Sequence, residues 1–343
     1  MRFSVIIPHY DSTGELSKKM LNGLLQTLEN QDFNKKDYEV IIVDDLSPFS
    51  VEGIEKYTMN LNYLKLEKNE GVALARQIGI EHAKGDYVLF IDNDDNLFSK
   101  KTLSKLDLLL EDDTCVLSTG FLEDTNKDDP DGKRIFLPHY NDKTWMHGKV
   151  YKREFLIKNE ISFKPHLRYC EDAYFNNLAF SLAWDKVKFS NEITYIWYWN
   201  ENSITRRNDK EYNTKYFCDY IKATKTSLNN LKSRTQENHD EKLDFIILTI
   251  ALQSLGYIYY YFQQKEFRSE KTRKSPSYKE AMEQFKSFYE QYEGIYDWIN
   301  YDTFMDAMVR ARLMQTNRQP ILERQTFKQF IKSLGLKSHK VFD

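Results

Sequence analysis

Acidic side chains are concentrated in a few short segments that could carry chemistry. Asp44 is followed by a second aspartate, Asp92 and Asp94 are separated by one residue, and a glutamate directly precedes Asp172. Two carboxylates one residue apart can present oxygens to a single Mg²⁺ or Mn²⁺, which prefer oxygen ligands and often share them with substrate phosphates. A carboxylate can also accept a proton from a substrate hydroxyl. Such segments are common in turns and helix starts, so their position in the fold decides between these interpretations.

Four short apolar segments lead into these polar residues. They cover residues 3–7, 38–43, 61–66 and 87–91. Helical patterns lie between them, over residues 15–30, 51–57 and 72–83. The apolar segments are nearly continuous, as in strands buried on both faces. The alternation predicts an α/β fold with a mostly parallel sheet and helices on both faces.

Ligands of such sheets bind beyond the carboxyl ends of the strands, where the polar residues are found. The first strand leads to Pro8, Tyr10 and Asp11, the second to Asp44 and Asp45, and the fourth to Asp92, Asn93, Asp94 and Asp95. Several acids on one rim repel one another unless a cation lies between them. The pattern therefore predicts a divalent metal cofactor, Mn²⁺ or Mg²⁺.

Taken in order, these segments resemble the family 2 glycosyltransferases of the GT-A fold. Residues 3–11 are similar to the opening strand, although an aspartate replaces the family's asparagine after Pro-x-Tyr. Residues 43–47 read Val-Asp-Asp-Leu-Ser, residues 69–79 resemble Asn-x-Gly…Ala-Arg-Asn-x-Gly, and residues 85–95 resemble the strand with the metal motif. The pair Glu171-Asp172 resembles the Glu-Asp pair with the catalytic base. The resemblance covers about residues 1–207, and it implies a Rossmann-like GT-A domain.

The resemblance also implies roles for individual residues. Donor binding would fall to Pro8, Tyr10, Asp11, Asp44, Asn69, Arg76, Asp92, Asn93, Arg206 and Arg207. Tyr10 would stack on a uracil ring, and Asp44 would accept its N–H. Arg76 and the start of its helix would face the diphosphate. Asp172 would deprotonate the acceptor hydroxyl in a single inverting displacement.

Further candidates lie between the metal motif and the base. Asp92 and Asp94 are the expected metal ligands, with His147 as a third. Trp145 and Glu171 are expected beside the sugar or the acceptor. The alternatives remain open at this point, because a lone histidine is more often a hydrogen-bonded loop residue and a tryptophan is more often core. In the same way, Arg206 and Arg207 also fit a solvated basic loop.

The chain changes character near residue 209. Glycine and proline become scarce, and helical patterns cover residues 210–232, 242–262, 278–292 and 301–314. We expect a GT-A domain over residues 1–208 and a helical domain over 209–343 for acceptor binding or homo-oligomer formation. Residues 243–262 approach the length of a membrane span, but Asp244 and four tyrosines favour a buried or interface helix. The basic segment 265–279 fits either peripheral contact with an anionic membrane or a solvated loop.

Composition excludes some classes of function. The 343 residues carry a formal net charge of -3, without the basic excess of nucleic-acid-binding proteins. Three scattered cysteines, Cys115, Cys170 and Cys218, do not form a disulfide or zinc pattern. No signal-peptide pattern precedes the first strand. We expect a cytoplasmic location, with peripheral contact at the inner membrane face as an option.

Together with these observations, the resemblance implies an inverting glycosyltransferase. By the same resemblance its donor would be a nucleotide-sugar, and a UDP-sugar in particular, while its acceptor would be a glycan or lipid-linked glycan. The pathway would be cell-surface polysaccharide, teichoic-acid or glycoprotein glycan synthesis. A catalytically silent glycan-binding or scaffold protein on the same fold is the alternative. A nucleotidyltransferase fits less well, because a single glycine, Gly14, follows the first strand in place of a glycine-rich loop.

Overall fold

The computed structural model describes residues 1–12, 14–49, 51, 53–201, 203, 212–238, 241–263, 269–292, 329 and 331–337. The chain divides into two compact units, residues 1–206 and 207–343. The predicted domain boundary after residue 208 falls outside the described residues and stays a prediction.

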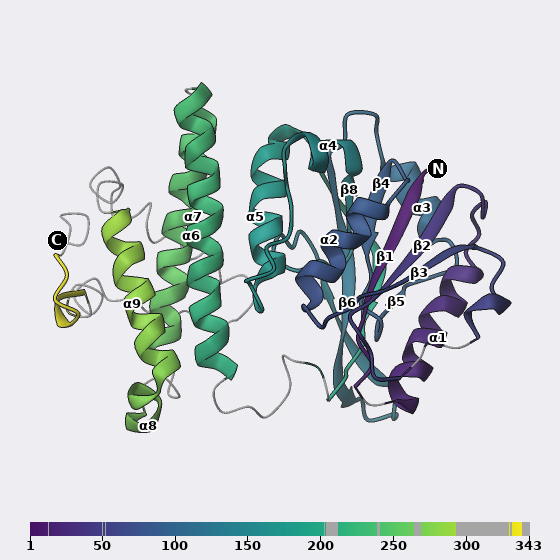
Figure 1. The fold of residues 1–343 in the computed structure, drawn as a ribbon, viewed down its shortest axis with the longest axis horizontal. Coiled ribbons are helices and arrows are strands. Elements are labelled where there is room, and N and C mark those ends of the chain that lie inside the picture. Colours follow the sequence, from purple (N-terminus) through teal and green to yellow (C-terminus); the bar gives the residue numbers. More distant parts are fainter. Residues whose placement is uncertain are drawn as a thin grey trace. The chain divides into compact units, whose positions relative to one another are not determined.

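Within the described residues, the first unit contains one nine-stranded sheet (Figure 1). Its strands are β1 (Phe3–His9), β2 (Tyr38–Asp44), β3 (Asn60–Lys65), β4 (Tyr87–Phe90), β5 (Asn96–Leu97), β6 (Val116–Asp128), β7 (Arg134–His139), β8 (Lys149–Lys152) and β9 (Val187–Trp197). Their order is β3-β2-β1-β4-β8-β6-β9-β5, and β7 pairs with β6.

The first four strands of this order are parallel, as the sequence predicts. Val5 of β1 lies opposite Val40 of β2 and Leu89 of β4. Beyond β4 the sheet is mixed, because β8 runs antiparallel to both β4 and β6 while β9 runs parallel to β6. The predicted α/β fold is therefore confirmed, and the sheet continues beyond β4 in a mixed extension.

Helices cover both faces of the sheet. They are α1 (Glu15–Glu29), α2 (Val72–His82), α3 (Thr102–Leu109), α4 (Arg153–Lys158) and α5 (Glu171–Ala183). Val5 and Ile7 belong to the same buried core as Leu24 of α1. Ile6 points to the opposite face, where a Cβ added at Gly79 of α2 would lie only 2.2 Å from its Cγ2 atom. Alternate residues of one strand thus support different helical layers.

The helix predicted over residues 51–57 is wrong for the part of that segment that the structure describes. A single 3₁₀ turn covers Ile54–Lys56. Gly53 before it has a φ of 71°, in the left-handed region, which a continuous α-helix does not accommodate.

The second unit contains α6 (Tyr212–Asn238), α7 (Glu241–Gln263), α8 (Glu270–Lys274) and α9 (Pro276–Gln291) among its described residues. Ser275 caps α9 by accepting a hydrogen bond from the Tyr278 N–H, and Pro276 occupies the first turn. The helix predicted over 301–314 lies outside the described residues. None of the described helices is long and apolar enough to span a bilayer.

Candidate active site

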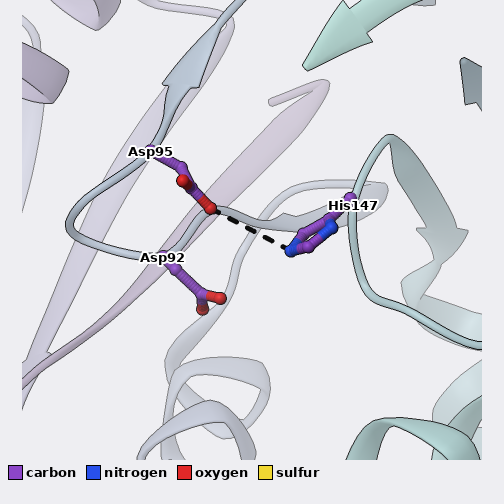
Figure 2. A group of neighbouring side chains, drawn as sticks. All are labelled: Asp92, Asp95 and His147. Atoms are coloured by element: carbon purple, nitrogen blue, oxygen red, sulfur yellow. Dashed lines mark ion pairs between the residues drawn. The ribbon is translucent and has the colours of Figure 1, made fainter. Parts of the chain in front are cut away.

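The turn after β4 brings two acids and a histidine together (Figure 2). The Asp95 N–H donates to the Asp92 carbonyl over 3.0 Å, which closes a turn and places the two side chains on one side. His147 reaches them from the loop before β8, and its Nε2 lies 4.0 Å from Asp95 Oδ2. One potential ligand atom from each of the three residues lies within 4.8 Å of the others.

This group contains Asp92 and His147 as expected from the sequence, but Asp95 where the sequence suggested Asp94. The Asp94 Oδ2 accepts a hydrogen bond from Asn200 Nδ2 at 2.8 Å. Asp95 is 1% exposed and accepts a hydrogen bond of 2.6 Å from the Tyr195 hydroxyl. The signal that could have found Asp95 is the turn itself, because residues three apart in a tight turn approach each other. A ligand role for Asp94 stays a prediction.

The electrostatics of the group fit a divalent cation. Burial, together with Asp94 and Asp92, raises the pKa of Asp95 well above its usual value. Burial opposes ionisation of Asp92 as well, but the Arg76 guanidinium outweighs it and lowers the pKa of Asp92. Burial lowers the pKa of His147 to about 4, so its imidazole is neutral and able to bind a metal. Two carboxylates and a neutral imidazole suit Mn²⁺ better than Mg²⁺, which prefers oxygen ligands alone, and a cation would relieve the repulsion between the acids.

Arg76 of α2 connects this group to the start of α5. Its side chain is buried, with one terminal nitrogen 2.7 Å from Asp92 Oδ1 and the other 2.7 Å from Glu171 Oε1. The sequence placed Arg76 against a phosphate, whereas the structure pairs it with two carboxylates of the protein. Arg76 therefore holds the turn after β4 and the first turn of α5 in a fixed relation.

Asp172 follows in the first turn of α5. Its Oδ1 accepts a hydrogen bond of 2.7 Å from the Ala173 N–H. Burial and the neighbouring Glu171 carboxylate raise the pKa of Asp172 to about 7, against the opposing effect of Arg76. A carboxylate with a pKa near neutrality is suited to accept a proton from a hydroxyl group.

The ends of β1 and β2 form the other side of the predicted site. The Asp44 carboxylate is fully buried and accepts hydrogen bonds from the Ser47 N–H and the Tyr63 hydroxyl. Asp11 accepts a hydrogen bond of 2.6 Å from the Gly14 N–H. Tyr10, in contrast, is 46% exposed and available for stacking.

Asp45 has a role that the sequence did not suggest. Its carboxylate accepts hydrogen bonds from the N–H groups of Glu70 and Gly71, at 2.7 and 2.8 Å, and its carbonyl accepts one from Asn69 Nδ2 at 3.0 Å. Asp45 thereby occupies the N-terminal end of α2 that was expected to face a phosphate.

Several remaining candidates are located by the structure. Pro8 lies within β1, and Asn93 Nδ2 lies 3.1 Å from His9 Nδ1. The ring centroids of Trp145 and His147 are 6.2 Å apart, so Trp145 lies next to the metal candidate. Arg206 and Arg207 lie outside the described residues.

Comparison with known proteins assigns the first part of this chain to a family. The model of glycosyl transferase family 2 matches residues 4–167. Residues 4–167 form a family 2 glycosyltransferase domain. The match includes β1, β2, β4 and the loop with His147, and it ends shortly before the Glu171-Asp172 pair.

Relatives of this family 2 domain include two enzymes that act on poly(ribitol phosphate). The chain is 32% identical over 213 residues to the poly(ribitol-phosphate) beta-N-acetylglucosaminyltransferase TarS of Staphylococcus aureus (strain Mu50), a match that covers 55% of this chain and 35% of TarS. It is 28% identical over 216 residues to a poly(ribitol-phosphate) beta-glucosyltransferase of Bacillus spizizenii, with 57% and 32% covered. The chain thus spans about a third of the length of these curated relatives.

The fold is shared with a solved structure of TarS. The crystal structure of S. aureus TarS 1–349 in complex with UDP-GlcNAc superimposes with a TM-score of 0.65 at 20% identity, covering 94% of this chain and 95% of that one. The chain therefore has a mixed α/β, GT-A-like fold followed by a helical region, as the sequence predicts.

Proposed function

We propose that this chain is an inverting glycosyltransferase that moves a sugar from a UDP-sugar to a hydroxyl group of a cell-surface polymer. Support for the donor comes from the shared fold with TarS in complex with UDP-GlcNAc. Support for the acceptor comes from the two relatives named for poly(ribitol phosphate). A polyol-phosphate polymer of the teichoic-acid type is our preferred acceptor class.

The observation that carries the proposal is the ion network centred on Arg76. It joins Asp92, on the metal side, to Glu171, which is the neighbour of the candidate base Asp172. Glycosyl transfer needs a base for the acceptor and a positive centre for the leaving group at a fixed separation. A single buried side chain that contacts both elements can hold that separation fixed.

The reaction follows from these positions. Asp172 accepts the proton of the acceptor hydroxyl while the hydroxyl oxygen attacks the anomeric carbon. The bond between that carbon and the diphosphate oxygen breaks in the same step, and the configuration inverts. Asp92, Asp95 and His147 would hold a divalent cation, which when bound supplies Lewis-acid stabilisation of the departing diphosphate.

Donor recognition is proposed for the ends of the strands. Tyr10 would stack on the base with Pro8 beside it, while Asp44, Asn69 and Asn93 would complete the nucleoside side. Trp145 and Glu171 would face the sugar or the acceptor. The Asp11 carboxylate accepts a hydrogen bond from the Gly14 N–H, so Asp11 would act by holding the loop between β1 and α1.

We infer a cytoplasmic enzyme that meets its acceptor at the inner membrane face. The helices of the second unit would bind the acceptor or form a homo-oligomer. Arg206 and Arg207 would approach the diphosphate when the donor is bound.

The experiment that tests the proposal measures UDP release from a panel of UDP-sugars with Mn²⁺, with and without poly(ribitol phosphate). We expect UDP-GlcNAc or UDP-glucose to be turned over, and the rate to fall by roughly 10²–10⁴-fold in Asp172→Asn. Asp92→Ala and addition of EDTA should also abolish turnover. Asp185→Asn, an exposed aspartate just after α5, is the matched control and should behave as the native protein.

Two other outcomes would change the conclusion. Binding of a nucleotide-sugar without turnover on any acceptor would favour the catalytically silent glycan-binding or scaffold protein. Absence of nucleotide-sugar binding, with and without metal, would overturn the proposal.

A further inference from the structure

A buried ion pair lies behind the metal candidate, where β8 begins. The Lys149 side chain is 0% exposed, and its Nζ lies 2.9 Å from Asp142 Oδ1. The same oxygen accepts hydrogen bonds from the N–H groups of Thr144, at 3.0 Å, and Trp145, at 2.8 Å. The Asp142 carboxylate thus binds an ammonium group and two backbone N–H groups, and these contacts close residues 142–149 into a compact loop.

Helix α5 holds the same loop from a second direction. Asn176 is fully buried, and its Nδ2 donates to the carbonyls of Thr144, at 2.7 Å, and Trp145, at 3.2 Å. Its Oδ1 accepts a hydrogen bond from the Tyr151 hydroxyl of β8. Asn176 is four residues after Asp172, about one helical turn further along α5.

The far end of the loop is attached to β6. The Gly148 carbonyl accepts hydrogen bonds of 2.8 Å from both the N–H and the hydroxyl of Thr119. Gly148 has a φ of +65°, and a Cβ there would lie 2.9 Å from Thr119 Oγ1. Glycine is therefore needed at this position for the loop to lie against the strand.

Stability alone does not account for the buried lysine and aspartate. An ion pair taken out of water is often no more stabilising than apolar side chains of the same volume. Its geometric effect is specific, because the loop that it closes carries His147, which faces Asp92 and Asp95 (Figure 2). The ion pair of Lys149 and Asp142 is thus better explained by the position that it gives to His147.

We propose that Lys149, Asp142 and Asn176 are positioning residues, which hold the loop 142–148 so that the His147 imidazole is directed at the metal. Asn176 also ties this loop to the helix that carries Asp172, so the metal side and the base side share one support. The inference rests on the proposed function, because it takes Asp92, Asp95 and His147 as the cation site.

The test uses Mn²⁺ alone as the probe and the full chain without nucleotide. We expect Lys149→Met to weaken Mn²⁺ binding, measured by titration calorimetry, by roughly 10–100-fold, as is usual when the support of a metal ligand is lost. Electron spin echo spectra of bound Mn²⁺ should lose the coupling to an imidazole nitrogen, with His147→Ala as the reference. Amide hydrogen exchange in residues 144–148 should become faster.

Lys152→Met is the matched control, with the same substitution on the same strand. The Lys152 ammonium donates to the Asp112 carbonyl at an exposed position, at 2.7 Å. We expect Mn²⁺ affinity, nitrogen coupling and loop exchange to match the native protein. If Lys149→Met does not fold, Asn176→Ala, which loosens the loop from α5, replaces it and should show the same three changes.

The outcomes separate this inference from the proposed function. Native-like Mn²⁺ affinity, nitrogen coupling and loop exchange in Lys149→Met, or in Asn176→Ala where that variant replaces it, would overturn the positioning role. If the native protein itself does not bind Mn²⁺, the cation site of the proposed function fails. The exchange of residues 144–148 then decides alone whether these residues hold the loop.

Discussion

At the scale of single residues, the site depends on acids whose environments differ sharply. Arg76 keeps Asp92 ionised, while burial raises the pKa of Asp95 and of Asp172. Sequence reasoning proposed Asp92 as a metal ligand and Asp172 as the base because each belongs to a motif of the family. It named Asp95 at the end of the strand but could not place it beside Asp92 and His147, since this placement depends on a turn and on the hydroxyl of Tyr195, a hundred residues away.

The pH dependence of turnover is a prediction at this scale. The pKa of Asp172 is about 7 and lies above that of an ordinary aspartate, so the carboxylate is protonated and inactive as a base at lower pH. We expect kcat/KM to rise about tenfold per pH unit in acid and to level off above about pH 7. Initial rates of UDP release between pH 5 and about pH 9 would measure this profile. A flat profile in the native protein would exclude Asp172 as the base.

At the scale of elements, α2 is the part that positions Arg76. Gly79 lies three residues after Arg76, at the point where α2 touches β1. The absence of a side chain at Gly79 lets the helix approach the sheet closely. The sequence predicted α2 within a residue of its bounds, because its helical pattern is local. The contact between Gly79 and Ile6 depends on the sheet and could not be predicted in the same way.

Replacement of Gly79 tests this contact. Alanine usually stabilises a helix by about 1 kcal/mol relative to glycine. At Gly79 we expect the opposite sign, a loss of about 1–3 kcal/mol in the free energy of unfolding, because the new methyl group would overlap Ile6. Turnover should also fall, since α2 carries Arg76.

The control for this prediction is Gly23→Ala in α1. Nothing lies within 4 Å of a Cβ at that position, so the normal gain in stability is expected. Urea unfolding of both variants provides the measurement. A gain of similar size at Gly79 would show that α2 is less tightly seated than the structure indicates.

At the scale of the whole molecule, the strands of the parallel part of the sheet were predictable, whereas the strand pairing in its mixed part was not. Strands β1, β2 and β4 are nearly continuous apolar segments, each recognisable by itself, whereas β3 carries a weaker apolar pattern. In contrast, the paired residues of β6 and β8 are more than thirty positions apart in the sequence. Which strands pair there depends on the fold as a whole. The helical pattern after residue 209 predicted helices there, but it does not assign a function to any residue in them.

Independent folding of the first unit is a prediction at this scale. The large hydrophobic core around β1 and α1 is built from residues before 206 alone, as far as the described residues show. We expect a chain of residues 1–206 to unfold cooperatively in urea and to retain UDP binding in the presence of Mn²⁺. Circular dichroism and calorimetry would measure both properties. A truncated chain without a cooperative transition would show that the first unit needs the second for its stability.

The position of Asp45 and Arg76 has a consequence for how a nucleotide enters the site. The Asp45 carboxylate accepts hydrogen bonds from the N–H groups at the start of α2, and Arg76 forms ion pairs with Asp92 and Glu171. Two of the positive groups that the sequence offered to a diphosphate, Arg76 and the start of α2, are therefore already paired with the protein's own acids. These two groups therefore add little attraction for a diphosphate. We expect the cation held by Asp92, Asp95 and His147 to supply most of the positive charge that a bound donor meets in this part of the site.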